Sequence, residues 1–176
     1  MIKIKKLVDL LKKNKSDFFT GVPDSILKEL SYSLQNKNYR NHILATNEGS
    51  AVSLAIGKYL STQKVPVVYM QNSGLSNALN PLISIAHEKV YSIPLILIIG
   101  WRGSPRIKDE PQHNVKGKIT EQLLKLLNIK YTILRSNLDL KKFDKQIKIA
   151  KKNKRIVACL IEQGVIEKTK KKTKKK

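Results

Sequence analysis

The stretch VPVVYM at residues 65–70 decides the fold of this 176-residue chain. Its hydrophobicity is continuous, without the alternation of apolar and polar residues that a strand with one wet face shows. Such runs are typical of parallel strands that are buried on both faces. A second run of this kind, PLILII at residues 94–99, is the most apolar one in the chain. Both runs predict buried strands of an α/β domain.

Apolar runs and helical patterns alternate along the rest of the chain. An amphipathic helical pattern with lysines on its polar face opens it at residues 2–13. Shorter apolar runs predict four further strands, at residues 18–20, 43–45, 131–134 and 156–161. Six alternations of strand and helix favour an α/β three-layer sandwich, in which helices cover both faces of a mostly parallel six-stranded sheet.

The length of the chain limits the number of domains, and its polarity indicates whether it contains a membrane-spanning segment. A chain of 176 residues fits one domain with a full core and is too short for two ordinary ones. We expect this domain to span residues 1–167 and a disordered lysine-rich tail to follow at residues 168–176. The sequence has no uncharged apolar run of about 18 residues, so we expect a cytoplasmic protein without a membrane contact. Cys159 lies in an apolar run and is predicted to be a buried structural thiol.

The net charge of +22 comes from 35 basic and 13 acidic residues. Such an excess is typical of nucleic-acid-binding proteins. Here, however, the excess is nearly all lysine, spread over helix faces and the tail, without the interleaved aromatic side chains on which bases would stack. We therefore predict a solvated basic surface and no specific binding of nucleic acid.

The unusual residues collect in the loops that follow the predicted strands. In a parallel sheet these loops all emerge at the edge formed by the carboxyl ends of the strands, where ligands bind. They carry one acid after the second strand, Glu48, and two amide side chains after the third, Asn72 and Asn77. A loop of about sixteen residues begins at Gly100, and loops of that length are usually functional or disordered.

These loop segments resemble the N-terminal half of phosphonopyruvate decarboxylase, a family of thiamine-diphosphate-dependent 2-oxoacid decarboxylases to which sulfopyruvate decarboxylase is closely related. The resemblance runs from about residue 18 to about residue 163, with the motifs in the family's order. The segments that carry it are GVPDS (21–25), NEGSA (47–51), YMQNSGL (69–75), GWRG (100–103) and DEPQH (109–113). The last two look more like the phosphonate branch than the sulfonate branch.

The resemblance implies a thiamine-diphosphate-binding fold of the pyrimidine type. It implies that Glu48 is the acid that hydrogen-bonds the aminopyrimidine ring and so primes the cofactor, which requires apolar walls around its carboxyl group. It also implies that His113 moves a proton or binds the anionic substrate. The other residues that it implies at the cofactor are Gly21, Val22, Pro23, Asn72, Gly74 and Asn77, and those at the substrate are Ser25, Gln71, Arg102 and Gln112, together with His113.

Simpler explanations exist for several of these residues. Glu48 in the first turn of a helix would interact favourably with the helix dipole, by about 0.3–1 kcal/mol. Ser25 or Asp24 could cap the helix that follows the first strand. His113 could be a solvated loop residue and Arg102 a surface arginine, although a guanidinium group also suits a phosphonate.

The second half of such an active site is missing from the sequence. Enzymes of this family hold the diphosphate and Mg²⁺ through a Gly-Asp-Gly motif, and this chain contains none. We therefore expect a partner chain that supplies the diphosphate and Mg²⁺ site, no metal ligand in this chain, and a homodimer or an α2β2-type assembly. Sulfopyruvate is the alternative substrate to phosphonopyruvate. A non-catalytic basic binding protein, or a truncated remnant of the fold, is the alternative to an enzyme.

Overall fold

A computed structural model describes residues 1–35 and 41–168 of the chain. All but the first residue of the predicted lysine-rich tail therefore lies outside the described residues. The helices are α1 (Ile4–Lys13), α2 (Lys28–Gln35), α3 (Glu48–Thr62), η1 (Asn72–Ser76), α4 (Leu79–Pro81), η2 (Leu82–Ala86), α5 (Pro111–Leu126) and α6 (Asp139–Lys152). The strands are β1 (Phe19–Gly21), β2 (His42–Leu44), β3 (Val67–Gln71), β4 (Ile96–Trp101), β5 (Lys130–Leu134) and β6 (Val157–Glu162).

The six strands form one sheet in the order β2-β1-β3-β4-β6-β5, and every neighbouring pair is parallel. The strands that the continuous apolar runs predicted, β3 and β4, lie in the middle, and all residues of β4 and β6 are buried. The predicted six-stranded parallel sheet is thus confirmed. Its edge strand β2 differs, because Ile43 and Leu44 are exposed.

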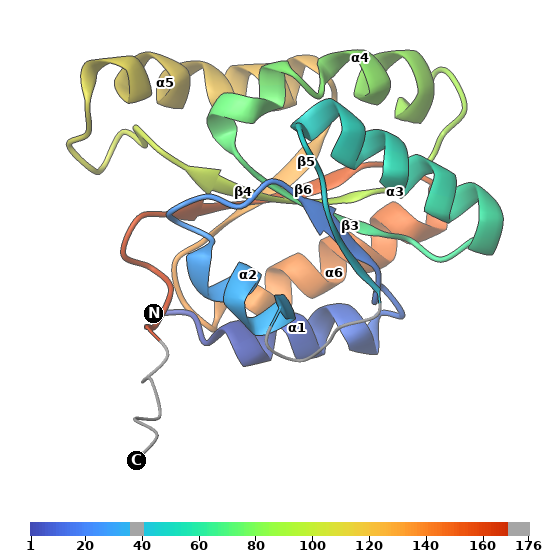
Figure 1. Cartoon of the computed structure of the whole chain (residues 1–176), viewed down its shortest axis with the longest axis horizontal. Helices are drawn as coiled ribbons and strands as arrows, with labels where there is room; N and C mark the ends of the chain where they lie inside the picture. The colour runs from blue at the N-terminus through green and yellow to red at the C-terminus, as the bar shows by residue number, and fades with distance from the viewer. Residues whose placement is uncertain (36–40, 169–176) are drawn as a thin grey trace.

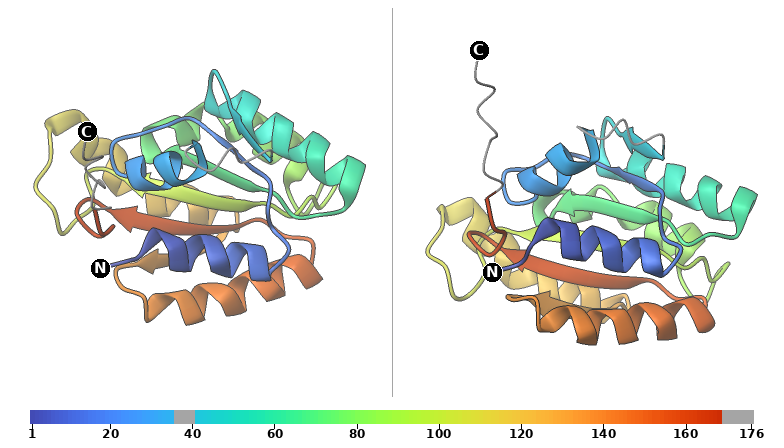
Figure 2. Two further views of the ribbon diagram at one scale, coloured as in Figure 1. Left: turned by 60° about the horizontal axis from the view of Figure 1, so that its bottom comes forward. Right: turned by 90° about the horizontal axis from the view of Figure 1, so that it is seen from below.

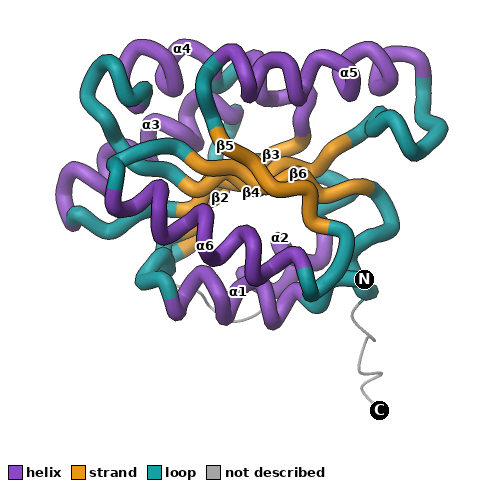
Figure 3. The backbone as a smooth tube through the Cα atoms, turned by 180° about the vertical axis from the view of Figure 1, so that it is seen from behind, coloured by secondary structure: helices purple, strands orange, loops and turns teal. Residues whose placement is uncertain are grey.

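Helices cover both faces of the sheet, as the predicted three-layer sandwich requires. Helices α3, α4 and α5 lie on one face, and α1, α2 and α6 lie on the other (Figure 1). The view from behind shows the same layers, with the sheet between the two groups of helices (Figure 3). Helices α1 and α6 run side by side, as two further views show (Figure 2).

The buried apolar residues of the described ranges, 1–35 and 41–168, form one core. The largest fully buried side chains include Trp101, Tyr69 and Phe19. Cys159 in β6 is fully buried, and burial raises the pKa of its thiol well above the ordinary value, as expected for a structural residue. The part of the chain that the structure describes contains no helix long and apolar enough to cross a membrane.

The connection between β3 and β4 contains only short helical turns, since the single α-turn Leu79–Pro81 is followed by a π-helical turn, Leu82–Ala86. One boundary differs from the sequence-based expectation. The long loop after β4 is shorter than predicted, because α5 begins at Pro111. Pro111 fits the first position of a helix. The sequence did not predict this start, because the residues of the first turn are polar and show no helical spacing of apolar residues. Gln112 and His113 are therefore helical and not loop residues.

Candidate active site

The strand order reverses between β1 and β3, because β2 lies on one side of β1 and β3 on the other. The connections that leave these two strands run on opposite faces, since α2 follows β1 on one face and α4 follows β3 on the other (Figure 1). A reversal of this kind leaves a crevice outside the carboxyl ends of the strands, where α/β proteins bind ligands. Several of the predicted site residues lie at this crevice.

Glu48 is the first residue of α3, and three neighbours fix its position. Asn47 caps the helix, since its Oδ1 accepts a hydrogen bond from the Ser50 amide at 2.8 Å. The Asn77 amide donates to Glu48 Oε2 at 2.9 Å. A Cβ atom at Gly74 would lie 2.1 Å from Glu48 Oε1, so only glycine lets the carboxylate lie against this backbone. The structure thus brings together Glu48, Gly74 and Asn77.

The Glu48 carboxylate is only half-buried, so the walls that its predicted role requires are incomplete in this chain. No hydrogen bond to Glu48 Oε1 is found among the residues that the structure describes, which leaves this oxygen for a donor from elsewhere. Because Glu48 is in the first helical turn, the favourable interaction with the helix dipole also applies. The two explanations of this residue are compatible.

Gly21 ends β1 and is required by the packing of Tyr69. An added Cβ atom would lie 2.1 Å from the Tyr69 carbonyl oxygen and 2.7 Å from the Cγ atom of its ring. The ring therefore passes close to Gly21, and its hydroxyl lies 2.9 Å from His42 Nε2 on β2. Burial raises the pKa of Tyr69 to about 12 and lowers the pKa of His42. This pair gives His42 a structural role.

Asp24, rather than Ser25, caps the segment that leads into α2. Its Oδ1 accepts hydrogen bonds from the amides of Ile26 at 2.6 Å and Leu27 at 3.1 Å, while Oδ2 is buried without a partner among the described residues. Burial raises the pKa of this carboxyl group, and the two amides and the charge of Arg102 offset part of the effect. Ser25 is exposed, as is Pro23 beside it. Sequence reasoning did not select Asp24 as a site residue.

Asn72 is buried and uses its amide group inside the protein. Its Nδ2 donates to the Arg102 carbonyl and to Thr120 Oγ1, both at 3.0 Å, and its Oδ1 accepts from the Arg102 amide at 3.0 Å. These bonds connect the end of β3 to the end of β4 and to α5. Asn72 therefore positions the surrounding loops, and its amide protons are not free for the cofactor contact that we predicted.

Arg102 forms a two-point ion pair with Asp109. The Nη2–Oδ1 and Nε–Oδ2 distances are 2.5 and 2.7 Å, and the Gly103 amide also donates to Asp109 Oδ2, at 2.9 Å. The hydrogen bond from Arg102 is the main cause that lowers the pKa of Asp109, and the same bond raises the pKa of Arg102. The predicted contact of Arg102 with a substrate would have to coexist with this pair.

The remaining predicted substrate residues, Gln71, Gln112 and His113, form no hydrogen bond with Glu48 among the described residues. Gln71 Nε2 donates to Ser73 Oγ at 2.7 Å, and Gln112 is exposed. His113 is in the first turn of α5, and its Nδ1 is buried without a hydrogen-bond partner among the described residues. Such an orphan nitrogen is available to a ligand or a partner.

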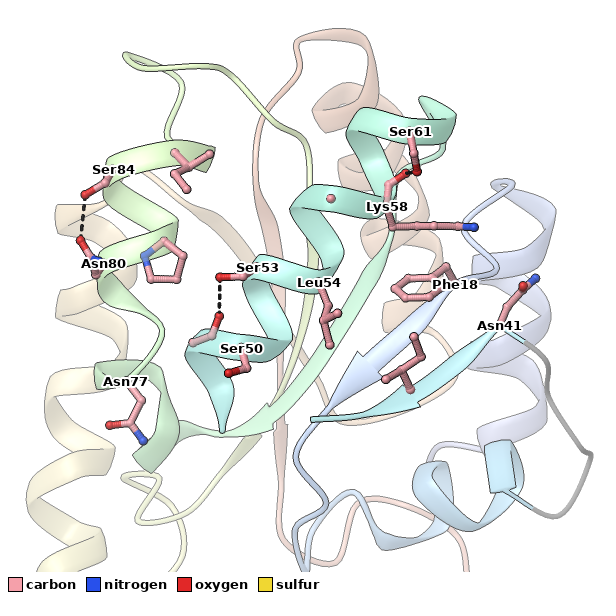
Figure 4. Close-up of a pocket in the computed structure, with 15 residues that line it drawn as sticks. Phe18, Asn41, Ser50, Ser53, Leu54, Lys58, Ser61, Asn77, Asn80 and Ser84 are labelled. Atoms are coloured by element: carbon pink, nitrogen blue, oxygen red, sulfur yellow. Dashed lines mark hydrogen bonds between the residues drawn. The ribbon is translucent and has the colours of Figure 1, made fainter. Parts of the chain in front are cut away.

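An open groove of about 1090 Å³ adjoins this site. It follows α3 from Gly49 to Ser61, between Asn77 and α4 on one side and Phe18 of the segment before β1 on the other (Figure 4). Asn77 lines the groove and also binds Glu48, so the groove and the candidate site are continuous. Among the described residues, no cluster of three His, Cys, Asp or Glu side chains could hold a metal ion.

A parallel sheet with a carboxylate and a glycine cradle at its strand-order reversal is typical of α/β domains that bind ligands at the carboxyl edge. A family model described as the thiamine pyrophosphate enzyme, N-terminal TPP binding domain, matches residues 4–124. The chain belongs to this family, whose cofactor is the thiamine diphosphate expected from the sequence.

Curated relatives match this chain at 30–37% identity. A phosphonopyruvate decarboxylase of Streptomyces viridochromogenes is 37% identical over 119 residues, which are 68% of this chain and 29% of the relative. A sulfopyruvate decarboxylase subunit alpha of Methanococcus maripaludis is 36% identical over 115 residues, 65% of this chain and 66% of the relative. The chain thus spans less than a third of the phosphonopyruvate decarboxylases that it matches.

The fold is also found in a solved structure. The benzoylformate decarboxylase from Polynucleobacter necessarius superposes with a TM-score of 0.71 at 21% identity, over 96% of this chain and 31% of that one. At this identity the likeness concerns the fold, and it confirms the architecture expected for a thiamine-diphosphate-binding domain.

The bonds of Asn72 predict a large loss of stability for Asn72→Ala. The change leaves the part-buried N–H and C=O groups of Arg102 without their partner and removes the buried bond to Thr120, which should lower the free energy of unfolding by about 2–3 kcal/mol. Gln71→Ala is the matched control, since among the described residues it removes an amide that bonds only to Ser73, and it should cost less than about 1 kcal/mol. Urea unfolding followed by circular dichroism measures both, and equal losses would contradict the structural role of Asn72.

The Arg102–Asp109 pair predicts a pH-dependent effect of Asp109→Asn. The pKa of Asp109 is lowered in the folded chain, so its stabilisation is present above the pKa of an unfolded aspartate, about 4, and is lost as the pH falls below that value. At pH 7 the variant should be less stable by about 1–3 kcal/mol, and the difference should shrink in acid. Denaturant unfolding at several pH values tests this. Asp9→Asn, at an exposed position of α1, is the control and should change stability by less than about 0.5 kcal/mol.

Proposed function

We propose that this chain is the pyrimidine-binding half of a thiamine-diphosphate-dependent carboxy-lyase that converts phosphonopyruvate to phosphonoacetaldehyde and CO₂. The observation that carries the proposal is the position of the Glu48 carboxylate, which lies at the carboxyl edge of the sheet, bound by Asn77 and resting on Gly74. Family membership and the phosphonopyruvate decarboxylase relatives support it.

The residues around Glu48 fit an aminopyrimidine ring. Asn77 holds Oε2, and Oε1 can accept a hydrogen bond from a protonated ring nitrogen. Gly74 keeps the space beside the carboxylate free of a side chain. Bound thiamine diphosphate would supply an electron sink for the carbon that loses CO₂. The task of Glu48 is to hold a proton at the ring nitrogen, and exclusion of water strengthens that hydrogen bond.

His113 and Ser25 are the proposed groups for the substrate. The unpaired Nδ1 of His113 can donate to an anionic group or move a proton, and the exposed Ser25 hydroxyl can contact a carboxylate. Arg102 would attract the phosphonate while it stays bound to Asp109, because a guanidinium group has five N–H donors. Gly21 and Val22 contribute backbone at the end of β1, and Gln71 and Gln112 stay predictions.

A partner chain is part of the proposal, because this chain has no Gly-Asp-Gly motif. The partner would bind the diphosphate and Mg²⁺ and would complete the walls around the half-buried Glu48. The relatives that are named as subunit alpha support an assembly of different chains, and a homodimer or an α2β2-type oligomer in the cytoplasm is proposed. Sulfopyruvate is the second candidate substrate, because this chain covers 66–70% of two of those alpha subunits.

The proposed role of Glu48 predicts that Glu48→Gln abolishes turnover. In the assembled complex the variant should release CO₂ at least about 100-fold more slowly, since general acid–base groups contribute 10²–10⁴-fold. Glu167→Gln is the control for the loss of one negative charge at an exposed position, and it should keep the wild-type rate. Circular dichroism should show that both variants are folded. A near-normal rate for Glu48→Gln would leave Glu48 as a helix-end residue only.

The proposed partner predicts that the purified chain alone is inactive. Incubation with thiamine diphosphate, Mg²⁺ and phosphonopyruvate should release no CO₂ above the background rate, and addition of the subunit with the Gly-Asp-Gly motif should restore release. The same assay with sulfopyruvate and pyruvate distinguishes the substrates. Strong activity of the chain alone would contradict the proposed division of the site, and inactivity of the complex with all three acids would favour a non-catalytic protein.

A further inference from the structure

Helix α6 carries four exposed lysines on one side. They recur at intervals of four, three and four residues and therefore lie along a single line on the helix surface. This lysine stripe consists of Lys141, Lys145, Lys148 and Lys152. The buried residues of the helix belong to the core and are Leu140, Phe143, Ile147 and Ala150. Since they occupy the opposite side of the helix, the stripe points away from the sheet into the solvent.

Helix α1 widens this basic surface, because it runs beside α6 on the same face of the sheet (Figure 2). The two helices together form the α1–α6 face and carry ten lysines and three aspartates. Helices α3 and α5, on the other face of the sheet, carry four lysines and two glutamates. The positive charge of the chain is thus distributed unevenly, with more of it on the α1–α6 face.

The stripe contributes little to the stability of the chain itself. Lysines four residues apart on a helix repel each other, and the stripe contains two such pairs, Lys141–Lys145 and Lys148–Lys152. Lys148 binds Asp144 at 2.6 Å, and no other lysine of the stripe forms an ion pair with the residues that the structure describes. A bound polyanion would remove this repulsion.

The residue types on the α1–α6 face indicate which polyanion it fits. Neither helix contains arginine, the side chain that most often reads base edges. Their one aromatic residue, Phe143, is fully buried, so no ring of these helices is available to stack on unpaired bases. Lysines without arginine or exposed aromatic side chains fit the phosphates of a duplex, whose bases are stacked inside.

An anionic membrane fits this face less well. A helix that lies on a membrane buries its apolar side in the lipid. The apolar side of α6 is instead buried in the core of the protein. Leu138 and Ile149 are exposed beside the stripe, but two side chains do not form an apolar face.

We propose that the α1–α6 face binds the phosphate backbone of double-stranded nucleic acid without sequence preference. From Lys141 to Lys152 the helix is about 16 Å long, and a duplex presents roughly ten phosphates over that length. Each lysine that neutralises a phosphate releases a bound counterion, so the binding weakens as salt is added. Helix α3 and the groove along it lie on the other face of the sheet, so this inference does not depend on the proposed function (Figure 1).

Fluorescence anisotropy of the full chain with short labelled DNA duplexes of two unrelated sequences tests the proposal. Both duplexes should bind with affinities that agree within about twofold, because phosphate contacts carry no sequence information. The slope of the logarithm of the association constant against the logarithm of the salt concentration should be about −3.6 or steeper, the value for four lysine–phosphate contacts.

Neutralising the stripe should weaken this binding. The variant Lys141→Gln/Lys145→Gln/Lys148→Gln/Lys152→Gln should lose at least about tenfold in affinity, and its salt slope should be less negative by about 3.6. The matched control changes the net charge equally by replacing with glutamine four exposed lysines outside the α1–α6 face, which are Lys64, Lys116, Lys118 and Lys125. It should stay within about threefold of the wild type, since distant charges are screened by salt. Both variants keep the lysines at residues 168–176, so that segment contributes equally to both.

A smaller variant separates the loss of contacts from a loss of structure. Lys141→Gln/Lys145→Gln leaves the Lys148–Asp144 pair intact, and its salt slope should be less negative by about 1.8. Equal losses of affinity in the four-lysine variant and its control would show a general effect of net charge and overturn the proposal. A wild type that binds neither duplex, that clearly prefers one of them, or that binds phosphatidylserine vesicles but no duplex would also overturn it.

Discussion

The parallel hydrogen bonding of β1, β3 and β4 determines where everything else in this protein lies. It places the loops that follow these strands at one edge of the sheet, and the reversal of strand order at β1 sends the next two helices to opposite faces. The acid of the site, Glu48, begins the helix on one face, while Asp24 leads into the helix on the other. Within this frame the side chains make two distinct sets of contacts.

In one set of contacts the polar side chains pair with each other inside the chain, and in the other set polar atoms have no partner among the described residues. Asn72 and the Arg102–Asp109 pair satisfy one another's polar groups and hold the ends of β3 and β4 to α5. Glu48 and His113 each keep a polar atom without a partner among the described residues. Polar groups that are fully paired make a site rigid, and unpaired ones are where a ligand gains free energy on binding. The division between scaffold and binding groups therefore follows the hydrogen bonds.

The strands were predictable from the sequence because burial on both faces leaves continuous apolar runs, as in β3 and β4. The position of Glu48 was predictable because the short apolar run at residues 43–45 ends just before it, although that strand, β2, is an exposed edge strand. The start of α5 was missed, because its first turn is polar and only Pro111 marks it. The contacts of Asn72 and Asp109 join residues from different elements, and no local pattern of residue types encodes such pairings.

The packing of Tyr69 against Gly21 has a consequence for how sequences of this kind are compared. The glycine of the GVPDS segment could be taken as evidence of a ligand that approaches the backbone closely. Here its lack of a side chain is required by an aromatic ring that reaches His42 within the same molecule. A glycine shared with related sequences at this position therefore reports on the interior of the domain, and a chain that had lost its cofactor would be expected to keep it.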